Sequence, residues 1–536
     1  TVGLDYTNNL AQILAEPLSP DVPQGTIAQR VPRAHVYTID YAGNVVRSLS
    51  DALESTTSFG MQVTAKKYET LTAIGTGLGA PDVTTIGSAQ VTSGSNTYSE
   101  NNSLGYFAQQ QLALHNRLFG TVALRADDNS SFGTNFDLIF YPKASVSWVL
   151  SEEPAVANVF ERLRVDDFKL RAAWGQAGRA PDPYSATQTY TVDKVTLGTA
   201  TGSALRTSAY GNPDLKPERG EEIELGFDAG VLDGRGGVEF TFYDKRMTDV
   251  IVPQAIPGST GFAGNQLTNL GETLNRGIEL ALTGTPFERD WLSWNVRVNL
   301  ATNHNELVTF GDPNKVKDTP TGQAYGVVQE HRPGYPLAGY WAQMPLRNAD
   351  GTPRLSATGT VLLDTATYVG PSAPTREIGF SNEFTIMRNV RLYTLLDYKG
   401  GHYLFNLKER NRCQAANANC WRVNDPRVTA PQTAADSLLA KEVPVWQQVP
   451  GAFIEKADFV KLREISVTWT LPRQWIGRTG ASSAALTVSG RNLALWTDYS
   501  GIDPEVNSYG NRSFVRTDAY AAPMNRRVAV SLNLTY

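Results

Sequence analysis

The chain contains two cysteines, Cys413 and Cys420, which lie in the loop-like segment NRCQAANANCWR. In an oxidising compartment, two cysteines this close in sequence favour a small disulfide loop. A metal site is disfavoured because no histidine or further cysteine lies nearby, and two free thiols are the remaining alternative. We therefore predict a disulfide between Cys413 and Cys420 in a surface loop.

A second polar group lies in the segment ADDNSSFG, where Asp127, Asp128, Asn129 and Ser130 offer the oxygen ligands that Ca²⁺ prefers. The segment lacks the length and spacing of a known calcium loop, so a polar turn beyond the end of a strand is the simpler interpretation. We expect no cofactor, and Ca²⁺ in this loop is the alternative.

The sequence carries none of the common motifs of enzymatic chemistry. Its five histidines are scattered singly, and it has no nucleophile elbow, P-loop or HExxH motif. Glu221 and Glu222 are adjacent, but neighbours in a strand face opposite ways, so they cannot act as a two-carboxylate couple. We predict that the chain is not an enzyme, and its net charge of −5 gives no basic patch for nucleic acid.

Two tryptophans lie in the long loop-like region 401–458, Trp421 in CWRVNDPRV and Trp446 in VPVWQQVPGAF. Exposed aromatic side chains can stack on sugars or anchor a protein partner. Packing within the loop, or a place in an interfacial girdle, is equally natural for tryptophan. Trp421 and Trp446 are therefore candidate contacts for a substrate or a partner.

Most of the chain consists of segments in which apolar and polar residues alternate, so that one face of a strand is apolar and the other polar. Long amphipathic helices are nearly absent. The strong segments span residues 104–114, 118–128, 143–151, 168–178, 222–232, 237–252, 277–284, 292–303, 377–386, 390–400, 459–471, 484–495 and the C-terminal stretch, and weaker ones lie near 1–7, 35–42, 58–68 and 338–346. We count roughly 15–17 strands, which predicts an all-β chain.

The C-terminal segment RRVAVSLNLTY shows the alternation most clearly, with apolar side chains at Val528, Val530, Leu532, Leu534 and Tyr536. In a soluble sandwich these side chains would face a core, and in a transmembrane barrel they would face lipid. Because the ends of soluble domains usually fray, a strand that alternates to its last residue favours the closing seam of a barrel.

The connections between strands alternate in length, which also favours a barrel. The segments DGRG and MRN are short, as periplasmic turns of outer-membrane barrels are, whereas extracellular loops are long. The long connections are 179–221, 253–276, 304–376, 401–458 and 496–525. With a mean hydropathy of −0.28, the chain does not resemble a helical membrane protein.

One segment, VKLREISVTW, breaks its own alternation. Lys461 and Arg463 share one face, and Glu464 falls on the other face before the pattern recovers. Such a slip predicts a β-bulge or a segment above the membrane. In VRVNLATNHNE, by contrast, Arg297 and Asn299 alternate regularly with valines, as a polar lumen allows.

Five segments in collinear order carry a family resemblance. They are LFGTVALRADDNSSFGTNFDLIFYPKASVSWVLSEEP (118–154), FKLRAAWGQAGR (168–179), NPDLKPERGEEIELGFDAGVLDGRGGVEFTFYDKRMTDVIV (212–252), LNRGIELALTG (274–284) and GRNLALWTDYSGIDPEV (490–506). Together they resemble the SusC/RagA-like TonB-dependent transporters. Each segment alone would be weak, and five in order are specific.

The resemblance implies a transmembrane antiparallel β-barrel in the outer membrane of a Gram-negative bacterium. The family's barrel has 22 strands and is filled by an N-terminal plug. Residues 1–536 contain no counterpart of the plug or of the TonB box. We therefore expect the chain to be the C-terminal portion of the barrel of a longer receptor.

The resemblance also implies TonB-dependent import of a nutrient, either a glycan or a peptide fragment. A SusD-like surface lipoprotein would cap the long loops, TonB would act through the missing N-terminal region, and outer-membrane lipid would surround the barrel. The barrel-assembly machinery would read the C-terminal strand ending at Tyr536. The alternatives are a structural or interaction barrel without active transport, and a passive pore.

Overall fold

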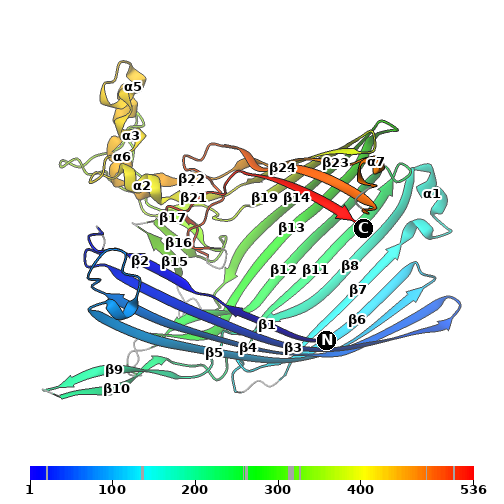
Figure 1. The fold of residues 1–536 in the computed structure, drawn as a ribbon, viewed down its shortest axis with the longest axis horizontal. Coiled ribbons are helices and arrows are strands. Elements are labelled where there is room, and N and C mark those ends of the chain that lie inside the picture. The colour runs from blue at the N-terminus through cyan, green and yellow to red at the C-terminus, as the bar shows by residue number, and fades with distance from the viewer. Residues whose placement is uncertain are drawn as a thin grey trace. The chain divides into compact units, whose positions relative to one another are not determined.

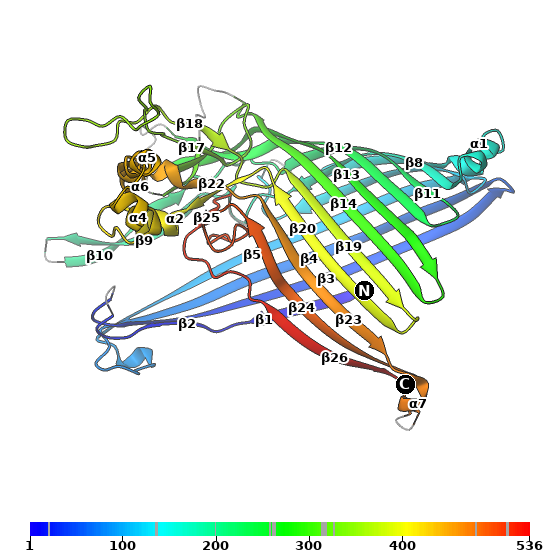
Figure 2. The same ribbon diagram turned by 90° about the horizontal axis from the view of Figure 1, so that it is seen from above.

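The computed structural model describes residues 1–536 except 20–21, 135–137, 199, 257–258, 260–263, 312–318, 325–326, 478–479 and 511–513. Within the described residues, seventeen strands belong to one large sheet (Figures 1 and 2). The all-β class and the expected 15–17 strands are thus confirmed. Antiparallel pairing follows the chain order, for example from β3 to β4 and from β23 to β24.

The seventeen strands differ widely in length. They are β1 (Val2–Asn8), β2 (Ala11–Ala15), β3 (Thr26–Ser50), β4 (Leu53–Thr76), β5 (Val91–Leu114), β6 (Leu118–Asn129), β7 (Ile139–Val149), β8 (Val165–Arg179), β11 (Glu218–Val231), β12 (Gly236–Ala255), β13 (Asn265–Arg289), β14 (Leu292–Thr309), β19 (Arg376–Ile386), β20 (Val390–Gly400), β23 (Phe459–Thr470), β24 (Ser483–Thr497) and β26 (Arg527–Thr535).

Tight turns join many of these strands at one end. His115 and Asn116 follow β5 with positive φ, and Met387 and Arg388 follow β19 in the same way. Two successive residues with positive φ give a mirror-image turn, whose twist matches that of the strands it joins. The short connections predicted from the sequence are therefore real hairpin turns.

The chain divides into two compact units. The first comprises Thr1–Val146, Ala173–Glu221 and Met247–Gly271, and the second comprises Ser147–Ala172, Glu222–Arg246 and Glu272–Tyr536.

In the first unit, β3, β4 and β5 pair along almost their whole length, from Thr26 opposite Thr76 to Leu53 opposite Leu114. They extend well beyond the predicted segments 35–42, 58–68 and 104–114. In β5 the added residues 91–103 are rich in Thr, Ser and Asn and carry no apolar alternation, so the sequence pattern did not reveal them. This unit also contains the hairpin of β9 (Thr189–Leu197) and β10 (Ala200–Ala209).

In the second unit, the long connections form their own small elements. One sheet contains β15 (Thr319–Ala324), β16 (Val327–His331), β17 (Gly339–Ala342) and β18 (Thr367–Gly370), and another contains β21 (Tyr403–Asn406), β22 (Ile454–Lys456) and β25 (Thr517–Asp518). The weaker candidate strand 338–346 is present in shortened form as β17, which pairs with β16 and β18 rather than with the large sheet.

A further correction concerns residues 253–276, which were expected to form a long loop. β12 continues to Ala255 and β13 already begins at Asn265. Residues 253–255 and 265–276 therefore belong to strands, so composition alone misplaced both boundaries.

The helices are short, as expected. They are α1 (Ala157–Arg162), α2 (Leu407–Cys413), α3 (Trp421–Asn424), α4 (Pro426–Thr429), α5 (Ala434–Ala440), α6 (Val443–Gln448) and α7 (Arg473–Ile476), with 3₁₀ turns η1 (Ile86–Ser88), η2 (Leu150–Glu152) and η4 (Pro450–Phe453). Among the described residues, no helix is long and apolar enough to cross a membrane.

Helices α2 to α6 group together in the second unit and form what we call the outer module, residues 407–448 (Figure 1). A buried cluster that includes Phe405, Phe453 and Tyr340 packs against this module. Cys413 and Cys420 are buried in the same cluster and form a disulfide with an S–S distance of 2.06 Å. The predicted cysteine pairing is therefore present in the structure.

Replacing Cys413 and Cys420 together with Ala should destabilise the outer module. Closing a loop of this length restricts the unfolded chain, so its loss should cost about 2–3 kcal/mol of local stability. Limited proteolysis within residues 407–448 measures the effect, and the exposed replacement Ala415→Ser serves as the control. Equal protease resistance of the parent and the double variant would contradict the prediction.

Candidate functional site

The second unit has a charged face that runs across several neighbouring strands. Register places Asn299 of β14 opposite Ala281 of β13 and Gly379 of β19, so these three positions share one face of the sheet. Gly379 in turn lies opposite Asp397 of β20. The neighbouring Leu280 and Leu300 fall at the alternate positions, which belong to the opposite, apolar face.

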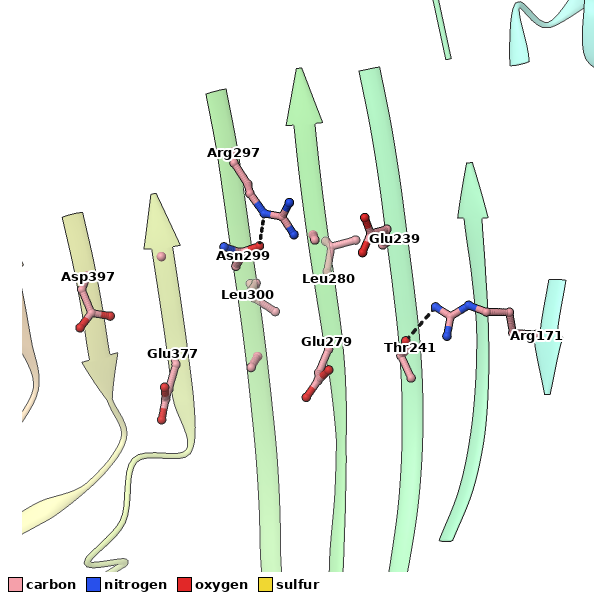
Figure 3. A pocket seen from close by; sticks show the side chains of 13 residues that line it. Arg171, Glu239, Thr241, Glu279, Leu280, Arg297, Asn299, Leu300, Glu377 and Asp397 are labelled. Carbon is pink, nitrogen blue, oxygen red and sulfur yellow. Dashed lines mark hydrogen bonds between the residues drawn. The ribbon is translucent and has the colours of Figure 1, made fainter. Parts of the chain in front are cut away.

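A cavity of about 360 Å³ lies on this charged face (Figure 3). Its lining comprises Arg171, Glu239, Thr241, Glu279, Ala281, Arg297, Asn299, Ala301, Glu377, Gly379 and Asp397. Leu280 and Leu300 also border it, although register assigns them to the alternate positions of their strands. The cavity exists because the small residues Ala281, Ala301 and Gly379 leave room between longer side chains. Carboxylates and guanidinium groups surround that room.

Some of the charges around the cavity are paired within the unit. Lys169 Nζ lies 2.7 Å and Arg171 Nη2 lies 2.8 Å from the carboxylate of Asp228. Arg171 also donates a hydrogen bond of 3.2 Å to Thr241 Oγ1, as Figure 3 shows. These pairs fix Arg171 beside the cavity with its donors largely engaged.

Other charges remain available to an incoming group. In the described part of the chain, neither Glu239 nor Glu279 forms an ion pair, and both side chains are exposed. Arg297 donates a hydrogen bond of 2.9 Å to Asn299 Oδ1 (Figure 3). The cavity can therefore offer two carboxylates and one guanidinium group to a polar solute.

A β-bulge borders the charged face, as the broken alternation of VKLREISVTW predicted. Leu396 lies opposite Leu462 and Leu395 lies opposite Glu464, so Arg463 is the extra residue. Beyond the extra residue, the alternation of faces is shifted by one residue. Ile465 therefore lies on the apolar face instead of the charged face. The prediction of a bulge is confirmed.

The bulge brings Arg463 to the carboxylate of Asp397, which lines the cavity. Arg463 Nε lies 2.8 Å from Asp397 Oδ2. The sequence pattern indicated a slip at Arg463 but none of its partners, and it did not distinguish Glu239 or Glu279 from other polar positions. For the two glutamates a signal existed, because GVEFTFY and GIELALTG place them at polar positions between apolar ones.

The opposite face of the unit is apolar and exposed. In β26, Val530 lies opposite Val488, and Leu532 lies opposite Leu486. Val528, Val530, Leu532, Leu534 and Tyr536 are all exposed, and Val530 reaches 67%. The structure therefore places all of these predicted residues on an uncovered surface, and their role in assembly stays a prediction.

The two candidate tryptophans lie in different surroundings. Trp421, at the start of α3, is 55% exposed. Trp446, in α6, is half-buried and packs against the cluster around Phe405 and Phe453. The structure does not bring them together as one binding surface, and only Trp421 is free to contact a partner.

The oxygen-rich segment after β6 already uses part of its side chains internally. Arg125 Nη2 lies 2.7 Å from Asp127, and Asn129 Oδ1 accepts hydrogen bonds from Asn101 and Ser131. Among the described residues, only Glu409, Cys413 and Cys420 gather in a metal-like group, and the two sulfurs are bonded to each other. The expectation of no cofactor, with Ca²⁺ as the alternative, remains a prediction.

Comparison with known proteins agrees with this two-faced sheet. Residues 3–417 match the model of the family described as TonB dependent receptor-like, beta-barrel. The TonB-dependent receptor P26 of Formosa agariphila is 25% identical over 80% of this chain and 46% of its own length. The TonB-dependent receptor SusC of Bacteroides thetaiotaomicron is 23% identical over 77% of this chain and 42% of its own length.

Among solved structures, the RagAB peptide transporter matches with a TM-score of 0.79 and 19% identity, covering 99% of this chain and 59% of its own. The chain thus spans about half the length of the relatives it matches. These relatives are receptors and a transporter rather than enzymes, as the sequence led us to expect, and the resemblance to SusC/RagA-like proteins is confirmed. With more than half of its residues matched by the family model, the chain belongs to the TonB-dependent receptor-like β-barrel family.

Proposed function

We propose that this chain forms part of the barrel wall of an outer-membrane importer in a Gram-negative bacterium. The observation that carries the proposal is the two-faced sheet of the second unit. One face exposes apolar side chains such as Val530, and the other presents charged side chains around a cavity. A wall of this kind suits lipid on the outside and water on the inside.

Energy for uptake would come from TonB, acting through a segment of the receptor that residues 1–536 do not include. The chain covers 46% of the length of receptor P26 and 42% of that of SusC, which leaves room for such a segment in those relatives. The charged face, which we call the luminal face from here on, would then line the route of the solute.

The transported solute would be an oligosaccharide or a peptide fragment. The luminal cavity offers carboxylates, a guanidinium group and an amide within one surface, which suits a polar solute rich in hydrogen-bonding groups. The structural relative RagAB is named as a peptide transporter, which supports a peptide.

A surface lipoprotein of the SusD type would capture the solute at the outer loops. The long connections 304–376 and 401–458 fold into small sheets and the outer module, so they can present a shaped surface to a protein. We expect such an interface to bury more than roughly 1,000 Å² of accessible surface, as stable protein interfaces do. Long loops of this kind commonly carry binding functions.

The proposal is tested by deleting the gene of the full-length receptor in its host and measuring uptake of radiolabelled oligosaccharide and oligopeptide pools. We expect one of the pools to be taken up by the parent strain, and that uptake to fall to background both in the deletion strain and after a protonophore. Uptake that the protonophore leaves intact would indicate a passive pore. Unchanged uptake of both pools in the deletion strain would indicate a structural barrel.

Replacing Trp421 with Ala should weaken the complex with the surface lipoprotein. Loss of an exposed aromatic anchor typically costs about 2 kcal/mol, or roughly thirtyfold in affinity. Co-purification of the lipoprotein with the receptor after mild extraction measures this loss of affinity. The matched control is Trp475→Ala in α7, which is also exposed at 64% but lies in the turn between β23 and β24. Equal recovery of the lipoprotein with both variants would contradict a role for Trp421.

Replacing Val530 with Lys should impair barrel stability in lipid, because a charge on the lipid face costs about 2–4 kcal/mol near the bilayer centre. Its neighbour Ser531 lies opposite Thr487 on the luminal face, so Ser531→Lys should cost little. Urea titration of the full-length receptor refolded in vesicles compares the two. A Ser531 variant as unstable as the Val530 variant would contradict the assignment of the two faces.

A further inference from the structure

The connection between β24 and β26 crosses from the sheet to the outer elements. We call its described residues, 498–510 and 514–526, the strap. It carries β25, which pairs in parallel with β21 so that Thr517 lies opposite Phe405. Tyr499 Oη also donates a hydrogen bond of 3.1 Å to Asp518, which ties the two halves of the strap together.

Lys461 of β23 holds the strap by a buried ion pair. Its side chain is only 5% exposed, and its Nζ lies 2.8 Å from Asp503 Oδ1 and 2.7 Å from Glu505 Oε2. The ring of Phe459 lies 5.2 Å from the same ammonium group and helps to shield it from water. Charges removed from water in this way interact strongly and are costly to separate.

Arg463, the extra residue of the bulge, reaches the strap and the luminal face at once. Its Nη1 and Nη2 lie 2.8 Å and 2.7 Å from the two carboxylate oxygens of Glu505. Its Nε lies 2.8 Å from Asp397, which lines the cavity. One guanidinium group therefore bridges a strap carboxylate and a cavity carboxylate.

Glu505 of the strap is charged at neutral pH, so its contact with Arg463 is an ion pair. Burial of Glu505 opposes its ionised form, but the hydrogen bonds from Arg463 and Lys461 outweigh burial and lower its pKa to about 2. Asp503 and Glu505 bring two negative charges from the strap. Lys461, Arg463 and Asp397 bring two positive charges and one negative charge from the sheet.

The sign of the coupling follows from this arrangement. Asp397 attracts Arg463 but repels the strap carboxylates, so it weakens the hold of the sheet on the strap. If the charge of Asp397 is cancelled, the sheet side of the network rises from one net positive charge to two, and the attraction to Asp503 and Glu505 increases.

We propose that Arg463 couples the charge at Asp397 in the luminal cavity to the attachment of the strap. Cancelling the negative charge of Asp397 tightens the strap, and removing Arg463 loosens it. This coupling goes beyond the proposed import function, because it links the luminal face to the outer elements and does not depend on which solute is carried.

Hydrogen–deuterium exchange of the full-length receptor in detergent, followed in peptides covering residues 498–507, tests the coupling. We expect Arg463→Met to speed exchange roughly tenfold, because a bidentate charge-assisted contact is lost. We expect Asp397→Asn to slow exchange about threefold, as a weaker effect of the same field. Arg463→Lys keeps the charge but not the bidentate contact, so its exchange rate should lie between those of Arg463→Met and the parent.

Glu377→Gln is the matched control, because Glu377 lines the same cavity but pairs with Lys399 at 3.3 Å and not with Arg463. It should leave exchange in the strap unchanged. Faster exchange in Asp397→Asn, or equal exchange in Asp397→Asn and Glu377→Gln, would overturn the coupling. If Arg463→Met fails to assemble, as judged by heat-modifiable migration, the exchange rates of Arg463→Lys and Asp397→Asn still test the coupling.

Discussion

The register of the large sheet is the constraint on which the rest of the structure depends. Each residue of a strand is assigned to one face by its position, and a slip of one residue would move every side chain to the wrong side. In the second unit, Leu280 and Leu300 occupy the apolar face while Glu279 and Asn299 occupy the charged face. The cavity, its charges and the apolar band exist only while this register holds.

The bulge at Arg463 shows how the fold uses that constraint. A single extra residue lets Lys461 and Arg463 face the strap while Ile465 and Val467 return to the apolar face. If the same sequence continued as a regular strand with no bulge at Arg463, those two apolar side chains would face the luminal side and Glu464 would face lipid. The same residue that corrects the register also supplies the guanidinium group that bridges Asp397 and Glu505.

Alternation along the sequence was sufficient to predict most strands of the large sheet and the bulge, because these depend on local pattern. It missed the ends of β3 and β4, the hairpin of β9 and β10, and residues 91–103 of β5, where no apolar stripe marks the strand. The ion pairs could not be predicted from this alternation, because Lys461 and Asp503 are far apart in the sequence and meet only in the folded structure. The small outer elements were also missed, because a helix of four residues such as α3 is stabilised by the buried cluster around Phe405 and not by its own sequence. For the same reason, composition could not tell the exposed Trp421 from the half-buried Trp446.

Nitroxide scanning of β23 in the full-length receptor, reconstituted in lipid, tests the register most directly. Single cysteines from Phe459 to Thr470 would be labelled one at a time, and collision with oxygen, which favours lipid, would be compared with collision with a water-soluble nickel complex. We expect collision rates with a period of 2 on either side of Arg463, with the phase reversed across the bulge. A single unbroken phase from Phe459 to Thr470, or no alternation at all, would contradict it.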